Sequence, residues 1–116
     1  MSKVLVVDDE PEIVQFVSSA LEDEGFEVLR AANGRQAVDA AARGRPDLIV
    51  LDMQLPRKAG HEVAQDIRRL HGDIPILLIT ADGRAQEMAQ RVGAFAFLSK
   101  PFDVEELLGL IRDRLG

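Results

Sequence analysis

Short hydrophobic runs alternate along the chain with longer stretches in which hydrophobic residues recur at helical spacing. The five runs have the length of strands and occupy residues 3–7, 26–31, 47–51, 75–79 and 94–98. The first, third and fourth runs consist almost entirely of Val, Leu and Ile, which is typical of strands covered on both faces of a parallel sheet. The second and fifth runs are less uniformly apolar, so we expect them nearer the sheet edges.

A segment with helical periodicity follows each run. After Pro11, which is favourable in a first helical turn, Ile13, Val14, Val17, Ala20 and Leu21 fall on one face. The later segments are marked by Ala37, Val38 and Ala41; by Val63, Ile67 and Leu70; by Ala85, Met88, Ala89 and Val92; and by Val104, Leu107, Leu108, Ile111 and Leu115. The pattern therefore predicts five helices.

Polar residues and glycines predict where these helices begin and end. Asn33 is the expected N-cap of the second helix, and Asp103 with Glu106 resembles a capping box at the last. A glycine follows every helix, and we expect each to end its helix in a left-handed conformation, which glycine adopts without a Cβ clash. These glycines are Gly25, Gly44, Gly72, Gly93 and Gly116.

The alternation predicts an α/β fold, (βα)5, with a parallel sheet and right-handed crossovers. Five strands are too few for a closed barrel, so we expect an open, doubly wound, five-stranded sheet. The expected strand order, 2-1-3-4-5, is an order known from other sheets with this architecture and does not follow from the pattern itself. Because the chain has 116 residues and no linker or repeat, residues 1–116 are predicted to form a single domain. Ligands of such sheets bind beyond the carboxyl ends of the strands.

Charge and composition exclude several functions. The net charge is −6, and residues 1–30 carry all of it, which argues against direct nucleic-acid binding by this chain. The absence of cysteine excludes disulfides, thiolate zinc sites and thiol catalysis. Since the chain shows no signal peptide and no apolar stretch of membrane-spanning length, we expect a cytoplasmic protein without membrane contact.

Reactive side chains gather at the predicted carboxyl ends of the strands. Asp8 and Asp9 follow the first, Asp52 the third, Thr80 ends the fourth and Lys100 follows the fifth. Three carboxylates at one edge repel each other unless a cation joins them, and an all-oxygen ligand set favours Mg²⁺. Aspartate is also a nucleophile toward phosphoryl groups, and an ammonium can neutralise the transferring oxygens. The cluster therefore predicts phosphoryl transfer to Asp52.

Each of these residues also has an ordinary structural explanation. Taken alone, Asp9 is better explained as a helix N-cap. Thr80 and Asp82 are rival caps for the fourth helix, and Lys100 is a candidate surface lysine. These explanations leave open why all the candidates share one edge of the sheet, and this favours a site.

The chain resembles a response-regulator receiver domain of two-component signalling, with a flavodoxin-like fold. The resemblance covers essentially all residues and rests on four motifs, namely Val4-Leu5-Val6-Val7-Asp8-Asp9-Glu10, Asp52-Met53-Gln54-Leu55-Pro56 with Gly60, Thr80-Ala81, and Lys100-Pro101-Phe102. Any one motif is weak, but the ordered set is specific.

The resemblance implies a role for each matching residue. It makes Asp52 the phosphoacceptor, Asp8, Asp9, Asp52 and the backbone carbonyl of Gln54 the Mg²⁺ ligands, and Lys100 the partner of the phosphoryl group. It makes Thr80 and Phe97 the switch residues and a cis bond before Pro101 the expected geometry. His61, which follows Gly60, is interpreted as a surface residue and not as a second phosphoacceptor.

The resemblance also implies partners. A histidine kinase or histidine phosphotransfer protein would dock near Pro11–Gln15 and donate the phosphoryl group. A downstream output protein or domain would read the surface of the fourth helix, fifth strand and fifth helix, which is also the candidate face for a homodimer. That face is equally well explained as ordinary solvated surface. Receiver domains are not conventional enzymes, although they assist their own phosphoryl transfer and autodephosphorylation.

Three other functions compete with this interpretation. A haloacid-dehalogenase-type phosphohydrolase would need an acid two residues after the nucleophile, where this chain has Gln54. A flavodoxin-type flavin carrier would need a phosphate-binding loop in place of Asp8-Asp9-Glu10-Pro11. A degenerate receiver, which binds partners without being phosphorylated, is disfavoured by the complete set of acidic, hydroxyl and ammonium groups.

Overall fold

The computed structural model describes residues 1–55 and 59–116, so Pro56 of the second motif lies outside the described residues. Strands and helices alternate throughout the described chain. The strands are β1 (Lys3–Val7), β2 (Glu27–Ala31), β3 (Leu48–Asp52), β4 (Ile76–Thr80) and β5 (Ala96–Ser99). The helices are α1 (Pro11–Asp23), α2 (Gly34–Gly44), α3 (Gly60–His71), α4 (Ala85–Val92) and α5 (Val104–Leu115).

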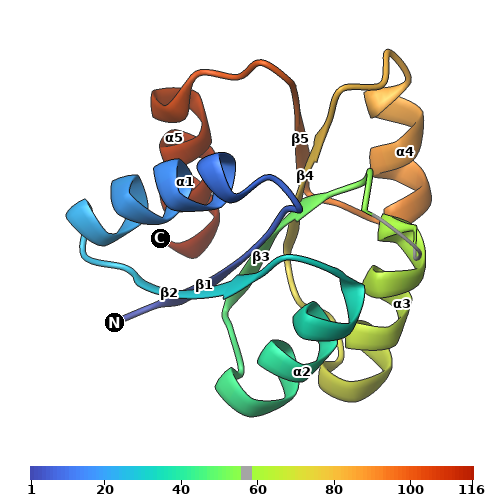
Figure 1. The fold of residues 1–116 in the computed structure, drawn as a ribbon, viewed down its shortest axis with the longest axis horizontal. Helices are drawn as coiled ribbons and strands as arrows, with labels where there is room; N and C mark the ends of the chain where they lie inside the picture. Colours follow the sequence, from blue (N-terminus) through green and yellow to red (C-terminus); the bar gives the residue numbers. More distant parts are fainter. Residues whose placement is uncertain (56–58) are drawn as a thin grey trace.

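The sheet is parallel and has the predicted order, β2-β1-β3-β4-β5. Helices α1 and α5 cover one face of the sheet, and α2, α3 and α4 cover the other (Figure 1). The register aligns the strand ends, since Val7 pairs with Leu51 and Asp52 pairs with Ile79. The fold confirms the doubly wound α/β prediction, and it brings the residues after β1, β3, β4 and β5 to one edge.

The continuous hydrophobic runs are explained by a core on each side of the sheet. In β1, Val4 and Val6 pack with residues of α1 and α5, whereas Leu5 and Val7 pack with residues of α2 and α3. Successive strand side chains point to opposite faces, so a strand that is covered twice needs apolar residues at every position. All five residues of β3 and of β4 are buried, in contrast to β2 and β5 at the edges.

Four of the five helix-ending glycines have the predicted positive φ, between 73° and 93°. The prediction for Gly44 is wrong, because Gly44 is the last residue of α2 and Arg45 adopts the left-handed conformation, with φ 48°. A Cβ on Gly44 would lie 2.3 Å from Leu29 Cδ1. The glycine at this position is therefore explained by close packing of α2 on β2, and the turn falls one residue later.

The helix caps agree with the sequence in part. The Asn33 side chain accepts a hydrogen bond from the Gln36 N–H, as predicted. Asp103 is also an N-cap, but its carboxylate accepts from the Glu105 N–H and not from that of Glu106. Strand β5 begins at Ala96, later than predicted, because the Ala94 N–H bonds to Ala89 O and completes the end of α4.

Candidate functional site

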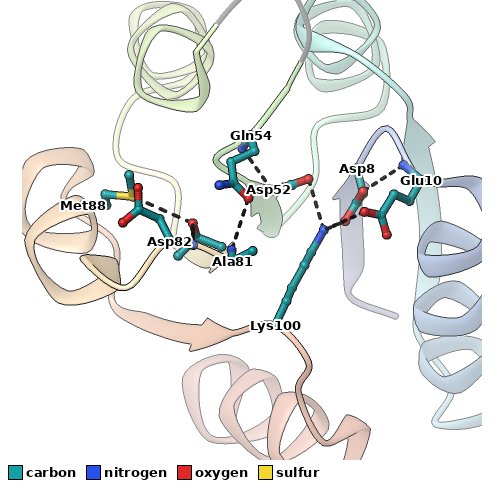
Figure 2. A network of polar contacts seen from close by, with 9 residues as sticks. Asp8, Glu10, Asp52, Gln54, Ala81, Asp82, Met88 and Lys100 are labelled. Carbon is teal, nitrogen blue, oxygen red and sulfur yellow. Dashed lines mark hydrogen bonds and ion pairs between the residues drawn. The ribbon is translucent and has the colours of Figure 1, made fainter.

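Four of the predicted site residues converge at the carboxyl edge of the sheet. Asp8 follows β1, Asp52 and Thr80 are the last residues of β3 and β4, and Lys100 follows β5. Their side chains come from different strands, and the sticks of Asp8, Asp52 and Lys100 point toward one another in Figure 2. Asp8 and Asp52 are each only 2% exposed, and Thr80 is fully buried. Burial of two carboxylates at one edge requires compensating charge.

The ammonium of Lys100 supplies that charge. Its Nζ lies 3.0 Å from Asp8 Oδ2 and 3.3 Å from Asp52 Oδ2, with Glu10 Oε1 further away at 3.8 Å. The Lys100 side chain is 14% exposed and both aspartates are buried, so the ion pairs with Asp8 and Asp52 are largely removed from water. The backbone N–H of Lys100 also donates to Thr80 O, which connects the start of the β5–α5 loop to the end of β4.

The two buried carboxylates are oriented in the same way. Asp8 Oδ1 accepts from the Glu10 N–H at 2.9 Å, and Asp52 Oδ1 accepts from the Gln54 N–H at 3.0 Å. An aspartate that accepts from the backbone two residues later forms a local turn that fixes its side chain. In each case the second oxygen is left facing Lys100, so the loops after β1 and β3 aim both carboxylates at the same place.

The surroundings shift the pKa values of Asp52 and Lys100, which lie 3.3 Å apart. Burial raises the pKa of Asp52, and the negative charge of Asp8 raises it further, against the lowering effects of the Gln54 N–H and Lys100. Burial by itself lowers the pKa of Lys100, but its close contacts with the negative charges of Asp8 and Asp52 outweigh this, and its net pKa lies above the usual range. A cation at the site would therefore stabilise ionised Asp52.

The acidic loop after β1 has the donor set of a hard divalent cation. Asp8, Asp9 and Glu10 each offer a carboxylate oxygen, and these atoms all lie within 4.8 Å of one another. Asp8 is buried, and its Oδ2 has the Lys100 ion pair but no hydrogen bond of good geometry. Asp9 and Glu10 are exposed to solvent. These oxygen ligands fit Mg²⁺, which binds through a few carboxylates and keeps several waters.

The acidic cluster differs from the predicted ligand set. Glu10 belongs to the cluster but not to the predicted ligands, although its position directly after Asp8-Asp9 is a signal in the sequence. Asp52 stands beside the cluster and is linked to it through Lys100. The interpretation of Asp9 as an N-cap is wrong, because Glu10 is the N-cap of α1 and no side chain caps that helix.

Thr80 is bonded within its own loop. Its Oγ1 accepts from the Asp82 N–H at 3.0 Å and lies 3.8 Å from Met88 Sδ, on the first turns of α4. Asp82 in turn accepts from the Arg84 N–H, and Arg84 lowers the pKa of the Asp82 carboxyl through hydrogen bonds and charge. Neither Thr80 nor Asp82 caps α4, whose N-cap is Arg84 without a side-chain bond. Both capping predictions are therefore wrong.

A contact missed by the sequence analysis joins the loops after β3 and β4. The side-chain Oε1 of Gln54 accepts from the Ala81 N–H at 3.2 Å, as the dashed line in Figure 2 shows. Phe97, the predicted switch aromatic, lies on β5 with 38% of its surface exposed. The bond between Lys100 and Pro101 is cis, as the resemblance implied.

Comparison with known proteins identifies the class to which this site belongs. A family model described as the response regulator receiver domain matches residues 4–112. The chain therefore belongs to the response-regulator receiver domain family, whose general function is phosphorylation-based signalling in two-component systems. Receiver domains are not classical enzymes, and Mg²⁺ binding at an acidic site is typical of them. The match removes the phosphohydrolase and flavin-carrier alternatives.

Individual relatives match nearly the full length of the chain. The DNA-binding dual master transcriptional regulator RpaA of Synechocystis is 42% identical over an alignment of 116 positions, which covers 97% of this chain and 48% of the relative. Sporulation initiation phosphotransferase F of Bacillus subtilis is 32% identical over 115 residues, covering 97% of this chain and 93% of the relative. The chain spans about half the length of RpaA and of several other curated relatives.

Solved structures agree with the fold. Chemotaxis protein CheY4 of Vibrio cholerae has a TM-score of 0.89 and 38% identity, with 97% of this chain and 98% of that chain covered. Response regulator TrrA of Thermotoga maritima, solved in complex with Mg²⁺-BeF, has a TM-score of 0.87 and 34% identity, with 97% and 98% covered. None of the helices in the described part of the chain is long and apolar enough to cross a membrane.

Proposed function

We propose that this domain accepts a phosphoryl group on Asp52 from a histidine kinase or a histidine phosphotransfer protein. The observation that supports this most is the environment of the Asp52 carboxylate, which is buried, oriented by the Gln54 N–H and paired with Lys100 at 3.3 Å. A carboxylate held in one orientation beside an ammonium is positioned both to attack phosphorus and to have its product stabilised.

The transfer conserves bonds and charge. A carboxylate oxygen of Asp52 forms a bond to phosphorus while the bond from phosphorus to the donor imidazole nitrogen breaks, and the electron pair stays on that nitrogen. Lys100 is within reach of the oxygens that gain charge. We propose that Asp8, Asp9, Asp52 and the backbone carbonyl of Gln54 hold Mg²⁺, which when bound supplies positive charge to the phosphoryl oxygens.

Thr80 and Phe97 are proposed to transmit the change. The Thr80 hydroxyl would exchange its contacts with the Asp82 N–H and Met88 for the new phosphoryl oxygens, and Phe97 would turn inward from its half-exposed position. The phosphoryl group thereby interacts differently with two arrangements of the loop after β4, which is the requirement for shifting between them. The surface of α4, β5 and α5 changes as a result.

That surface is proposed to contact a downstream output protein or domain, and it is also the proposed face of a homodimer. Residues 1–116 form a single receiver domain in this proposal, which works in the cytoplasm and leaves direct nucleic-acid contact to other chains or domains. Several relatives are transcriptional regulators about twice as long as this chain, which supports an output of that kind.

Incubation with acetyl phosphate tests the phosphoacceptor assignment. We expect intact-mass spectrometry to show the gain of one phosphoryl group in the presence of Mg²⁺ and none in its absence. The Asp52→Asn variant should gain none under either condition. A wild-type protein that stays unmodified with Mg²⁺ and a saturating phosphodonor would be a degenerate receiver, and the proposal would be wrong.

A further inference from the structure

The C-terminal end of α4 is held by a side chain from a different helix. The guanidinium of Arg68, on α3, donates from Nη1 to Val92 O and from Nη2 to Gly93 O, the latter at 2.9 Å. Carbonyls at a helix C-terminus lack partners within the helix and carry its negative dipole end. The planar guanidinium satisfies two of them at once, in a charge-assisted, two-point contact.

The backbone at this point is shaped for the contact. Gly93 has φ 73°, and a Cβ at this residue would lie 3.3 Å from Arg68 Nη1. The glycine therefore ends α4 and also gives the guanidinium room to approach the carbonyls. The neighbouring Arg69 has a different role, because its side chain is 74% exposed and pairs with Asp66 on the same helix.

Hydrophobic packing contributes little further stabilisation to the position of α4. The helix has only eight residues, and its buried residues are Ala85, Ala89 and Val92. By comparison, α5 buries Leu107, Leu108 and Ile111. Since burial energy scales with apolar area, small side chains stabilise the position of α4 less than the larger side chains stabilise α5. The two-point contact of Arg68 therefore contributes a larger fraction of the free energy that keeps α4 in position.

The opposite end of α4 depends on the candidate site. Its N-cap, Arg84, makes no side-chain capping bond. The contacts near this end run through the loop after β4, namely Thr80 with Asp82 and Met88, and the Ala81 N–H with Gln54. The contacts of Thr80 with Asp82 and Met88 would be altered by a rearrangement of the Thr80 side chain, whereas the Arg68 contact involves no site residue.

We propose that Arg68 anchors the C-terminal end of α4 and makes this end the fixed point about which the helix turns. The anchor is a property of the unphosphorylated domain, and only its consequence for signalling rests on the proposed function. With the anchor in place, movement at the site displaces the N-terminal turn of α4 most. Without it, the whole helix shifts and loses its fixed position against α3.

Amide hydrogen exchange on the unphosphorylated protein tests the anchor directly. In Arg68→Ala we expect the amides of residues 90–94 to exchange about tenfold faster than in the wild type, because two charge-assisted hydrogen bonds are lost. The amides of β1 and β3 should be unchanged. The matched control is Arg69→Ala, which removes the same side chain one residue further on and should leave residues 90–94 as in the wild type.

A lysine variant keeps the test decisive if the alanine variant is globally destabilised. Arg68→Lys retains the charge but presents a single ammonium in place of the two-point guanidinium. We therefore expect amide exchange rates at residues 90–94 that lie between those of the wild type and those of Arg68→Ala. Wild-type exchange at these residues in both Arg68 variants, or the same increase in Arg69→Ala, would overturn the proposal.

The consequence for signalling is read from chemical shifts with Mg²⁺ and beryllofluoride as the phosphoryl mimic. On addition of the mimic to the wild type, we expect larger changes in amide chemical shift at residues 81–88 than at residues 92–95. In Arg68→Lys we expect the changes to spread over both segments. Equal shifts along wild-type α4 would contradict the fixed point. A wild-type protein that does not respond at all would refute the proposed function, while the exchange experiment would still decide the anchor.

Discussion

Replacing Lys100 by methionine removes the ammonium that lies between two buried carboxylates while keeping an unbranched side chain of similar length. Asp8 and Asp52 are then left facing each other, each 2% exposed, with their second oxygens unpaired. We expect this substitution to lower the stability of the unphosphorylated domain strongly at neutral pH, because the electrostatic compensation of both charges disappears.

The size of the effect follows from the burial of the three groups. Loss of one partner from a buried ion pair costs about 3–5 kcal/mol, and the lower end, about 3 kcal/mol, applies because burial raises the pKa of Asp52 and lets it take up a proton. The unfolding entropy of a domain of 116 residues is about 240 cal/mol/K, so the expected fall in Tm is about 12 °C.

Thermal unfolding followed by circular dichroism at several pH values is the appropriate assay. The folded-state pKa of Asp52 lies above its ordinary value of 3.8 because of burial, and without Lys100 it rises further. Since the folded state then binds the proton more tightly than the unfolded state, stability is lost as the pH rises above 3.8 and through the folded pKa. The deficit of the variant should therefore shrink on acidification toward that value.

Two further measurements separate charge from packing. At one common Mg²⁺ concentration, Mg²⁺ should stabilise Lys100→Met more than the wild type, since a bound cation replaces the missing ammonium and the variant binds it with a lower Kd. At about 100 times the Kd of the variant, its gain is about 2.7 kcal/mol. The control Lys3→Met removes a lysine that is 37% exposed, pairs with Glu27 and donates to Gly44 O, so its effect should stay at about 1 kcal/mol and be independent of Mg²⁺. A deficit of Lys100→Met that is independent of both pH and Mg²⁺ would refute the electrostatic reasoning.

Three other substitutions test separate parts of the account. Asp9→Ala removes an exposed carboxylate of the acidic cluster, so the Mg²⁺ affinity measured by calorimetry should fall at least tenfold. The Tm should change only as little as is usual for a surface substitution, and an unchanged affinity would exclude Asp9 as a ligand. Gly60→Ala places a Cβ 2.9 Å from Met53 Cα and should cost about 1–3 kcal/mol in urea unfolding, and a neutral effect would contradict the close approach. Thr80→Ala removes the acceptor of the Asp82 N–H and should lower the free energy of unfolding by about 1 kcal/mol. The variant should still accept phosphate, but with smaller chemical-shift changes in α4 than the wild type; a full wild-type response would contradict the switch role.

The parts of the fold that depend on periodicity could be predicted from the sequence. The run Val4–Val7 is apolar at every position because alternate residues face two different cores, and that pattern identifies a strand inside a parallel sheet. Given the strand order, the positions of Asp8, Asp52 and Lys100 at strand ends predict that they meet, since parallel strands end at the same edge. Neither step requires knowledge of side-chain contacts.

The features that were missed depend on contacts between elements that the sequence does not place side by side. Gly44 looked like a helix-ending glycine, but its requirement comes from Leu29 on the neighbouring strand. The bond of Gln54 to Ala81 and the contact of Arg68 with α4 each join loops or helices that are distant in the sequence. Local patterns contain no information about such contacts, because they follow from the packing of the finished fold.

Chemical trapping of the acyl phosphate tests the central claim most directly. After incubation with acetyl phosphate and Mg²⁺, borohydride reduces an aspartyl phosphate to homoserine, and peptide mapping then identifies the position. The account predicts homoserine at residue 52, dependent on both Mg²⁺ and the phosphodonor, with Asp8 and Asp9 intact. Reduction at either of those residues, or phosphate recovered on His61 with Asp52 unchanged, would contradict it.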